Sequence, residues 1–158
     1  MKPEEKIGQI LTERSFTIST AESCTGGLLS SKLTDVSGSS AYIKLNLVTY
    51  ANEAKSKMLG VSEEILKLYG AVSEECAQAM ASGLYKLTGS DICVSTTGIA
   101  GPTGGTAEKP TGLMYSSIYS SDKQRTYKIL MPPETPRIKM KELFANEVLE
   151  NILEFLKN

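Results

Sequence analysis

Segments in which apolar residues recur every three or four positions alternate along this chain with short apolar runs. The first pattern is typical of amphipathic helices, and the glycines, serines and acidic residues at its ends are typical helix caps and stops. With their cap residues, the predicted helices are 3–14, 28–33, 52–60, 62–70, 73–89 and 137–157. The short runs predict strands at 16–19, 42–50, 91–95, 113–119 and 125–129, the last two as a hairpin.

The order of these elements indicates the fold class. Helices alternate with strands in the first part of the chain and a hairpin follows late, which favours an α/β fold. We expect a three-layer α/β/α domain with a mixed, partly parallel sheet covered by helices on both faces. No internal repeat or linker divides the sequence, so residues 1–158 are expected to form a single domain.

Composition narrows the classes of partner. Hydrophobic residues make up 41% of the 158 residues and charged residues 22%, and the formal net charge is −1 without a block of like charges. These values argue against a nucleic-acid-binding surface. The polar N-terminus is not typical of a secretory signal, and no apolar run reaches the ~18 residues that a membrane span needs. We therefore expect a cytoplasmic protein without a membrane partner.

Three cysteines are scattered along the chain, and histidine is absent. The odd number argues against a disulfide framework, and the absence of a CxxC pair or a histidine argues against a zinc site. Cys76 and Cys93 lie in apolar patterns and are expected to be buried as small hydrophobic residues. We expect neither a metal nor a cofactor.

The segment TAESCTGG at residues 20–27 places a potential nucleophile between a predicted strand and a predicted helix. Such a turn points backbone N–H groups and the positive end of the helix at an anion or a developing oxyanion. Because the chain has no histidine, neither a Ser-His-Asp triad nor a Cys-His pair can form within it. An activated serine must use another base, and lysine is the leading candidate.

Three polar loops each follow a predicted strand, at residues 22–27, 49–55 and 95–105. Sites in open α/β sheets form beyond the carboxyl ends of the strands. If the first three strands are parallel, the three loops meet at one edge of the sheet.

Together these segments closely resemble the C-terminal domain of the competence/damage-inducible protein CinA, the nicotinamide-nucleotide amidohydrolase (NMN deamidase) family. The resemblance implies a stand-alone form of a domain that is elsewhere fused behind a larger N-terminal module. The matching stretches follow the family order along nearly the whole chain: TAESCTGG (20–27), DVSGSSA (35–41), VTYANEAK (48–55), LGV (59–61), GAVSEE (70–75) and TGIAGPTGGTAEKPTGL (97–113).

The resemblance also implies a reaction and the residues that carry it out. The family hydrolyses the carboxamide of nicotinamide mononucleotide to nicotinic acid mononucleotide and ammonia. Carried over by position, Ser23 is the nucleophile, Lys55 its base and Tyr50 a supporting hydroxyl, while Thr97 and Arg137 match further active-site positions. The expected partner is thus a small mononucleotide, and related domains suggest a homodimer.

The chemistry of amide hydrolysis suits these residues. Lys55 can take the proton of Ser23 only when it is uncharged, so its pKa must fall from ~10.4 towards roughly 7–8 through burial or a neighbouring cation. The N–H groups of Thr25, Gly26 and Gly27 are the expected oxyanion donors.

A substrate phosphate calls for backbone N–H groups and a cation that binds with two hydrogen bonds. The glycine-rich loop, with Gly98 and Gly101, and the side chain of Arg137 can supply them. The choice among the mononucleotide, its riboside and free nicotinamide stays open.

Two positions depart from the common family pattern. Asn46 stands where members commonly have glycine, and Ala51 replaces a common serine. Asparagine tolerates a positive φ better than most residues, so the backbone is expected to survive. Ala51 removes one possible hydrogen bond. A catalytically silent module of the same fold, which binds a nucleotide or a protein partner, is the alternative function.

Cys24 offers a different nucleophile for the same reaction. It could act with Glu22 and Lys55, as in Cys-Glu-Lys amidases, and cysteine is the better intrinsic nucleophile. Adjacent side chains point in different directions, so only one of Ser23 and Cys24 is expected to face the substrate. The resemblance, not the physics, favours Ser23.

Overall fold

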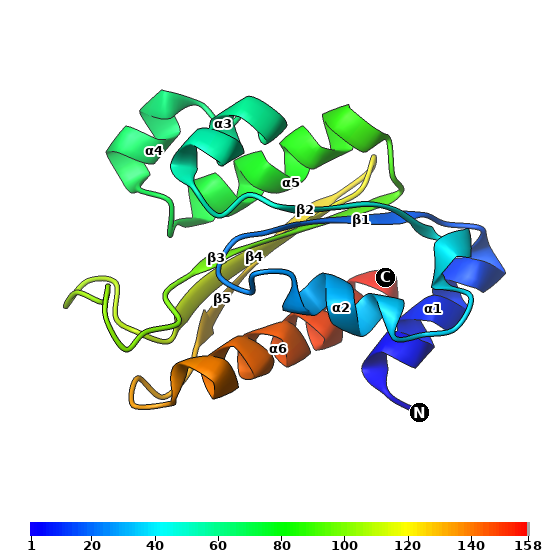
Figure 1. Cartoon of the computed structure of the whole chain (residues 1–158). Coiled ribbons are helices and arrows are strands. Elements are labelled where there is room, and N and C mark those ends of the chain that lie inside the picture. The colour runs from blue at the N-terminus through cyan, green and yellow to red at the C-terminus, as the bar shows by residue number, and fades with distance from the viewer. Residues whose placement is uncertain (158) are drawn as a thin grey trace.

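The computed structural model describes residues 1–157 and contains a five-stranded sheet in the order β2-β1-β3-β4-β5 (Figure 1). The strands β1, β2 and β3 are parallel, and the remaining neighbours are antiparallel. The predicted mixed, partly parallel sheet is therefore confirmed. The strands are β1 (Ile18–Glu22), β2 (Ile43–Val48), β3 (Ile92–Gly98), β4 (Leu113–Tyr119) and β5 (Gln124–Leu130).

Helices cover both faces of the sheet, which confirms the three-layer arrangement. Figure 1 shows α1, α2 and α6 on one face and α3, α4 and α5 on the other. A short 3-10 helix, Ser39–Ala41, precedes β2. The α-helices are α1 (Pro3–Arg14), α2 (Leu28–Thr34), α3 (Asn52–Leu59), α4 (Glu63–Tyr69), α5 (Glu74–Thr88) and α6 (Arg137–Lys157).

The helices and the hairpin lie where the sequence predicts them, but β1 and β3 end three residues later than predicted. The added residues are mostly polar, which hid them from a search for apolar runs. The polar side chains among them are nevertheless buried, and their partners lie in the sheet or in the segments next to it. Thr96 and Glu22, for example, are both fully buried; Thr96 bonds to Thr25, and Glu22 bonds to the start of α2. By contrast, β2 ends at Val48, two residues before the predicted end.

Each face of the sheet has its own apolar core. The face under α1, α2 and α6 carries the larger cluster, which includes Ile7, Leu29, Phe144 and Ile152. The face under α5 carries a smaller cluster, with Met80 and Leu84 among its members. The smaller cluster also holds the end of α3 against α5.

Gly83 allows this contact between α3 and α5. A Cβ atom at position 83 would lie only 1.8 Å from the carbonyl oxygen of Leu59, the last residue of α3. Backbone atoms cannot rotate away as a side chain can, so any side chain at position 83 must push the two helices apart. The position of α3 on the sheet therefore depends on the absence of a side chain at residue 83.

We expect Gly83→Ala to lower the free energy of unfolding by about 1–3 kcal/mol, because the added methyl overpacks a backbone contact. Urea unfolding followed by circular dichroism measures this loss. Gly8→Ala in α1 is the matched control, since its added methyl meets only the side chain of Tyr42. A Gly83→Ala protein as stable as the Gly8→Ala protein would contradict the explanation.

Candidate active site

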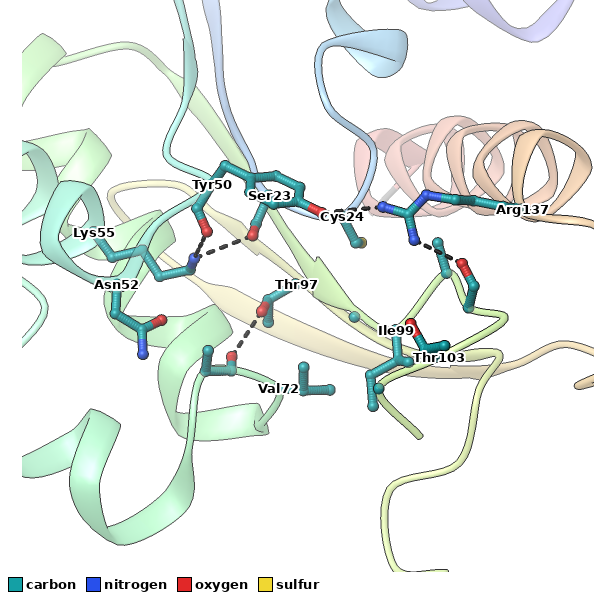
Figure 2. A pocket seen from close by; sticks show the side chains of 15 residues that line it. Ser23, Cys24, Tyr50, Asn52, Lys55, Val72, Thr97, Ile99, Thr103 and Arg137 are labelled. Carbon is teal, nitrogen blue, oxygen red and sulfur yellow. Dashed lines mark hydrogen bonds between the residues drawn. The ribbon is translucent and has the colours of Figure 1, made fainter. Parts of the chain in front are cut away.

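The three polar loops meet at the carboxyl ends of β1, β2 and β3, as the topology predicts. They surround a cavity of about 260 Å³ that the start of α6 also lines (Figure 2). Seven of the predicted site residues line this cavity: Ser23, Tyr50, Lys55, Thr97, Gly98, Gly101 and Arg137.

Lys55 lies at the base of the site with only 1% of its surface exposed. Its Nζ atom is 3.1 Å from Ser23 Oγ and 2.9 Å from each of the carbonyl oxygens of Thr49 and Tyr50. Among residues 1–157, no carboxylate forms an ion pair with this amine. Burial therefore lowers the pKa of Lys55 from its ordinary value of 10.5.

The three oxygens around Nζ can accept the three hydrogens of an ammonium, and they also accommodate an uncharged amine. A neutral amine has two hydrogens and one lone pair, and the two carbonyl oxygens of Thr49 and Tyr50 accept both hydrogens. Nζ also donates to the hydroxyl oxygen of Ser23 when the amine is charged (Figure 2), and when it is uncharged its lone pair faces this hydroxyl. Ser23 can donate its hydrogen to Lys55 in this arrangement, which is the first requirement of a serine nucleophile.

The local sequence explains why these groups come together. The chain leaves β2 at Val48 and enters α3 at Asn52, so the carbonyls of Thr49 and Tyr50 do not bond to a neighbouring strand. Lys55 lies in the first turn of α3, and its side chain folds back onto those carbonyls. Ala51 is the N-cap of this helix and provides no side-chain cap.

Glu22 organises the turn that carries Ser23. Its carboxylate is fully buried and accepts hydrogen bonds from the N–H groups of Gly27, Leu29 and Ser30. It also accepts from the hydroxyls of Thr25 and Ser30. The positive end of α2 is thus already satisfied by a carboxylate of the same chain. The expectation that this helix end faces a substrate anion or oxyanion is wrong.

Thr96 on β3 fixes Ser23 from the other side. The backbone N–H of Ser23 donates to the carbonyl of Thr96 at 3.1 Å and lies 3.2 Å from its hydroxyl oxygen. The hydroxyl of Thr96 is also 2.9 Å from that of Thr25, which in turn donates to Glu22. A chain of buried hydrogen bonds therefore links Glu22 to the backbone of Ser23.

The predicted oxyanion donors at Gly26 and Gly27 are not available, which corrects that expectation. Gly26 N–H donates to the carbonyl of Ser23 at 3.0 Å, and Gly27 N–H donates to Glu22. Neither glycine lines the cavity, and Thr25 is buried behind it. In the part of the chain that the structure describes, no protein oxygen accepts from the N–H of Cys24 or Thr25.

Tyr50 and Arg137 form a bridge over the mouth of the cavity (Figure 2). Arg137 Nη2 donates to the hydroxyl of Tyr50 at 3.1 Å, and its Nη1 donates to the carbonyl of Gly101 at 2.6 Å. Tyr50 is 60% exposed, and Arg137 is exposed as well. One guanidinium thus joins the segment after β2, the loop after β3 and the start of α6.

Thr97 lines the cavity, but its hydroxyl hydrogen is already used. Its Oγ1 atom donates to the carbonyl of Ala71 at 2.7 Å, which holds the segment between α4 and α5 against β3. Thr97 can therefore act on a ligand only as an acceptor, and its visible role is to position that wall.

Asn46 occupies an ordinary strand position in β2. Its side-chain oxygen accepts a hydrogen bond from the hydroxyl of Thr20 at 2.9 Å. Among residues 1–157, Ser15 is the only non-glycine residue with a positive φ. The positive φ considered for Asn46 is therefore wrong, and the asparagine binds the neighbouring strand instead.

Burial makes the cysteines poor nucleophiles. It raises the pKa of the Cys24 thiol to about 12, and those of Cys76 and Cys93 to about 11. The thiolate is the reactive form of cysteine, so this raised pKa holds Cys24 in the less reactive thiol form at neutral pH although it borders the cavity. The expected burial of Cys76 and Cys93 is confirmed.

Residues 1–157 contain no group of three or more histidine, cysteine or acidic side chains that could hold a metal ion. Within the same residues, no helix is long and apolar enough to cross a bilayer.

Sequence reasoning missed three features of this site. The carbonyls of Thr49 and Tyr50 carry no side-chain signal, and Thr96 lies in a strand that was predicted to end before it. Asn52 also lines the cavity, directly at the start of α3. Its place three residues before Lys55 is the signal that could have revealed it.

Comparison with known families agrees with the fold. A model of the CinA C-terminal domain matches residues 1–156. The chain belongs to this family. A CinA-like protein from Chloroherpeton thalassium is 50% identical over 158 residues. A putative competence-damage inducible protein from Caldanaerobacter subterraneus subsp. tengcongensis is 46% identical over 152 residues. This CinA domain spans 38% and 37% of the lengths of these two relatives.

Solved structures of the CinA family share the fold along the whole chain. The competence/damage inducible protein CihA from Agrobacterium tumefaciens is 36% identical with a TM-score of 0.91, and the alignment covers 100% of this chain and 98% of that one. A CinA superfamily protein from Klebsiella pneumoniae is 29% identical with a TM-score of 0.93, covering 98% and 96%.

We expect iodoacetamide to leave all three thiols of the native CinA domain unmodified at neutral pH, because burial keeps them protonated and enclosed. Intact-mass spectrometry should show no adduct on the native protein and three adducts in denaturant. The Cys24→Ala protein should show two adducts in denaturant. Rapid native labelling that Cys24→Ala abolishes would show that Cys24 is a reactive thiol.

Proposed function

We propose that this CinA domain is a serine amidohydrolase that converts nicotinamide mononucleotide to nicotinic acid mononucleotide and ammonia. The observation that carries the proposal is the buried Lys55 amine, with a lowered pKa, 3.1 Å from the hydroxyl of Ser23. The family resemblance supplies the substrate, and the geometry of the dyad supports the chemistry.

The proposed reaction proceeds through an acyl-enzyme. Ser23 gives its proton to Lys55 as Oγ attacks the carboxamide carbon, and a tetrahedral oxyanion forms. The N–H of Cys24, the residue after the nucleophile, is a suitable donor to that oxyanion. The Lys55 ammonium then protonates the departing nitrogen, which leaves as ammonia. A water molecule, deprotonated by Lys55, hydrolyses the ester and releases the acid.

The walls of the cavity suit a pyridine ring and a phosphate. Val72, Ile99 and Ala100 are apolar residues of the lining that can contact the ring. Arg137 at the mouth carries a guanidinium, which binds phosphate through paired hydrogen bonds. A phosphate would replace the hydroxyl of Tyr50 or the carbonyl of Gly101 as its partner.

Cys24 is a weaker choice of nucleophile than Ser23. The raised pKa of its thiol keeps the thiolate scarce, whereas the hydroxyl of Ser23 contacts a base directly. Physical chemistry now agrees with the family resemblance in favouring Ser23.

Ammonia release from the mononucleotide tests the proposal. We expect Ser23→Ala and Lys55→Ala each to lower kcat by about 10²–10⁴-fold, because either change removes the proton transfer that activates the nucleophile. Arg137→Ala should raise KM for the mononucleotide more than for the riboside. A coupled ammonia assay and chromatography of the acid product measure all three.

Nucleotide binding by Ser23→Ala, measured by calorimetry, is the control for a preserved site. A wild-type domain that binds the mononucleotide but releases no ammonia would make it a silent nucleotide-binding module.

The pH dependence of kcat/KM should report Lys55. Because burial lowers its pKa below 10.5, more of the amine is uncharged at neutral pH than in an exposed lysine. We expect kcat/KM to rise with pH through this lowered pKa and then to reach a plateau. Below that pKa the protonated amine cannot accept the serine proton. A profile that falls with rising pH across the neutral range would contradict Lys55 as the base.

A further inference from the structure

Most polar side chains that line the cavity already have partners. Lys55 donates to two carbonyls, Thr97 donates to Ala71, and Arg137 binds Tyr50 and Gly101. Among the described residues, the side chains of Asn52 and Thr103 line the same cavity and form no hydrogen bond. These two groups are free to bind a ligand directly.

Asn52 is the one of this pair that lies beside the reactive dyad. It is the first residue of α3, and Lys55 follows three positions later. Residues spaced by three lie on one face of a helix, with Cβ atoms about 5–6 Å apart. Figure 2 shows the amide of Asn52 next to Lys55, on the wall opposite Ile99 and Thr103. Thr103 lies instead in the exposed loop after β3.

The chemistry of Asn52 matches a particular ligand group. Its carbonyl oxygen accepts hydrogen bonds, and its NH₂ group donates them. A primary carboxamide presents the same two functions in the opposite sense, so the two amides can form a pair of parallel hydrogen bonds. We propose that Asn52 is a specificity-determining residue that recognises the primary carboxamide of the substrate. This inference rests on the proposed function of the Ser23–Lys55 site.

Amide pairing discriminates against two close analogues. The acid product is a carboxylate, which has no hydrogen to donate to Asn52 Oδ1, so one of the two hydrogen bonds becomes a repulsion between oxygens. A trans N-methylamide carries its methyl group on the side of the carbonyl oxygen, where the paired hydrogen would lie. Asn52 therefore selects the substrate and disfavours retention of the product.

Two variants separate recognition from folding. Asn52→Leu keeps nearly the same shape without polar atoms, and Asn52→Ala removes the group. Thr103→Val is the matched control, since it removes the other unpartnered polar side chain of the cavity. Thermal unfolding of all three checks that the fold is preserved.

We expect both Asn52 variants to lower kcat/KM for the mononucleotide by about 10–100-fold, as for the loss of hydrogen bonds to a substrate. The acid product should inhibit them more strongly than it inhibits the wild type, because the repulsion with Oδ1 is gone. The ratio of amide to N-methylamide turnover should also fall. Thr103→Val should leave the ratio of amide to N-methylamide turnover and the inhibition by the acid product unchanged, because Thr103 lies away from the dyad.

The outcomes distinguish this inference from the proposed function. Unchanged kcat/KM and unchanged product inhibition in Asn52→Leu would overturn the role of Asn52 while leaving the hydrolase intact. If the wild type releases no ammonia, calorimetry with the mononucleotide and with its acid still tests whether Asn52 recognises the carboxamide. A wild-type preference for the amide that Asn52→Leu abolishes supports recognition, and equal binding, or no binding of either, overturns it.

Discussion

The burial of one amine without a counterion is the constraint on which the rest of this site depends. Burial without a carboxylate partner disfavours the charged form of Lys55 and lowers its pKa, and two backbone carbonyls from the residues that precede its own helix accept its hydrogens. The only direction left for the lone pair is the hydroxyl of Ser23. Short chain segments thus place an amine beside a hydroxyl without a histidine, and the close contact at Gly83 packs the helix that carries Lys55 against α5.

A buried carboxylate, that of Glu22, holds the turn that carries Ser23. Glu22 sits at the end of β1 and binds the first turn of α2, so the turn between them is closed around one side chain. Through Thr25 and Thr96 the same network reaches the backbone of Ser23 and connects it to β3. The carboxylate oxygens of Glu22 accept the hydrogen bonds that hold the turn. Catalysis by Glu22, as in a Cys-Glu-Lys site, would require it to leave five donors.

The sequence was sufficient to predict the layers, the parallel strands and the meeting of three loops, because apolar spacing and helix caps are local signals. It was insufficient where polar residues are buried. Thr96 and Glu22 looked like loop residues, yet each lies in a strand. Thr96 bonds to Ser23 and Thr25, which are distant in sequence, and Glu22 bonds to the turn and helix that directly follow it. The role of Glu22 could not be read from its neighbours Ser23 and Cys24, since a carboxylate beside a nucleophile suggests chemistry as readily as capping. The hydrogen bond between Thr20 and Asn46 could not be predicted either, because it depends on the pairing of β1 with β2.

The occupied helix end has a consequence for how an anion reaches the cavity. With the positive pole of α2 neutralised from within, the guanidinium of Arg137 is an exposed positive charge that borders the cavity. Dissolved ions screen an exposed charge over about 8–10 Å at physiological ionic strength, while an enclosed pair is screened far less. Added salt should therefore weaken the capture of an anionic ligand and leave the bond between Lys55 and Ser23 unaffected. Ionic strength thus becomes a means to separate the arrival of a ligand from the steps that follow it.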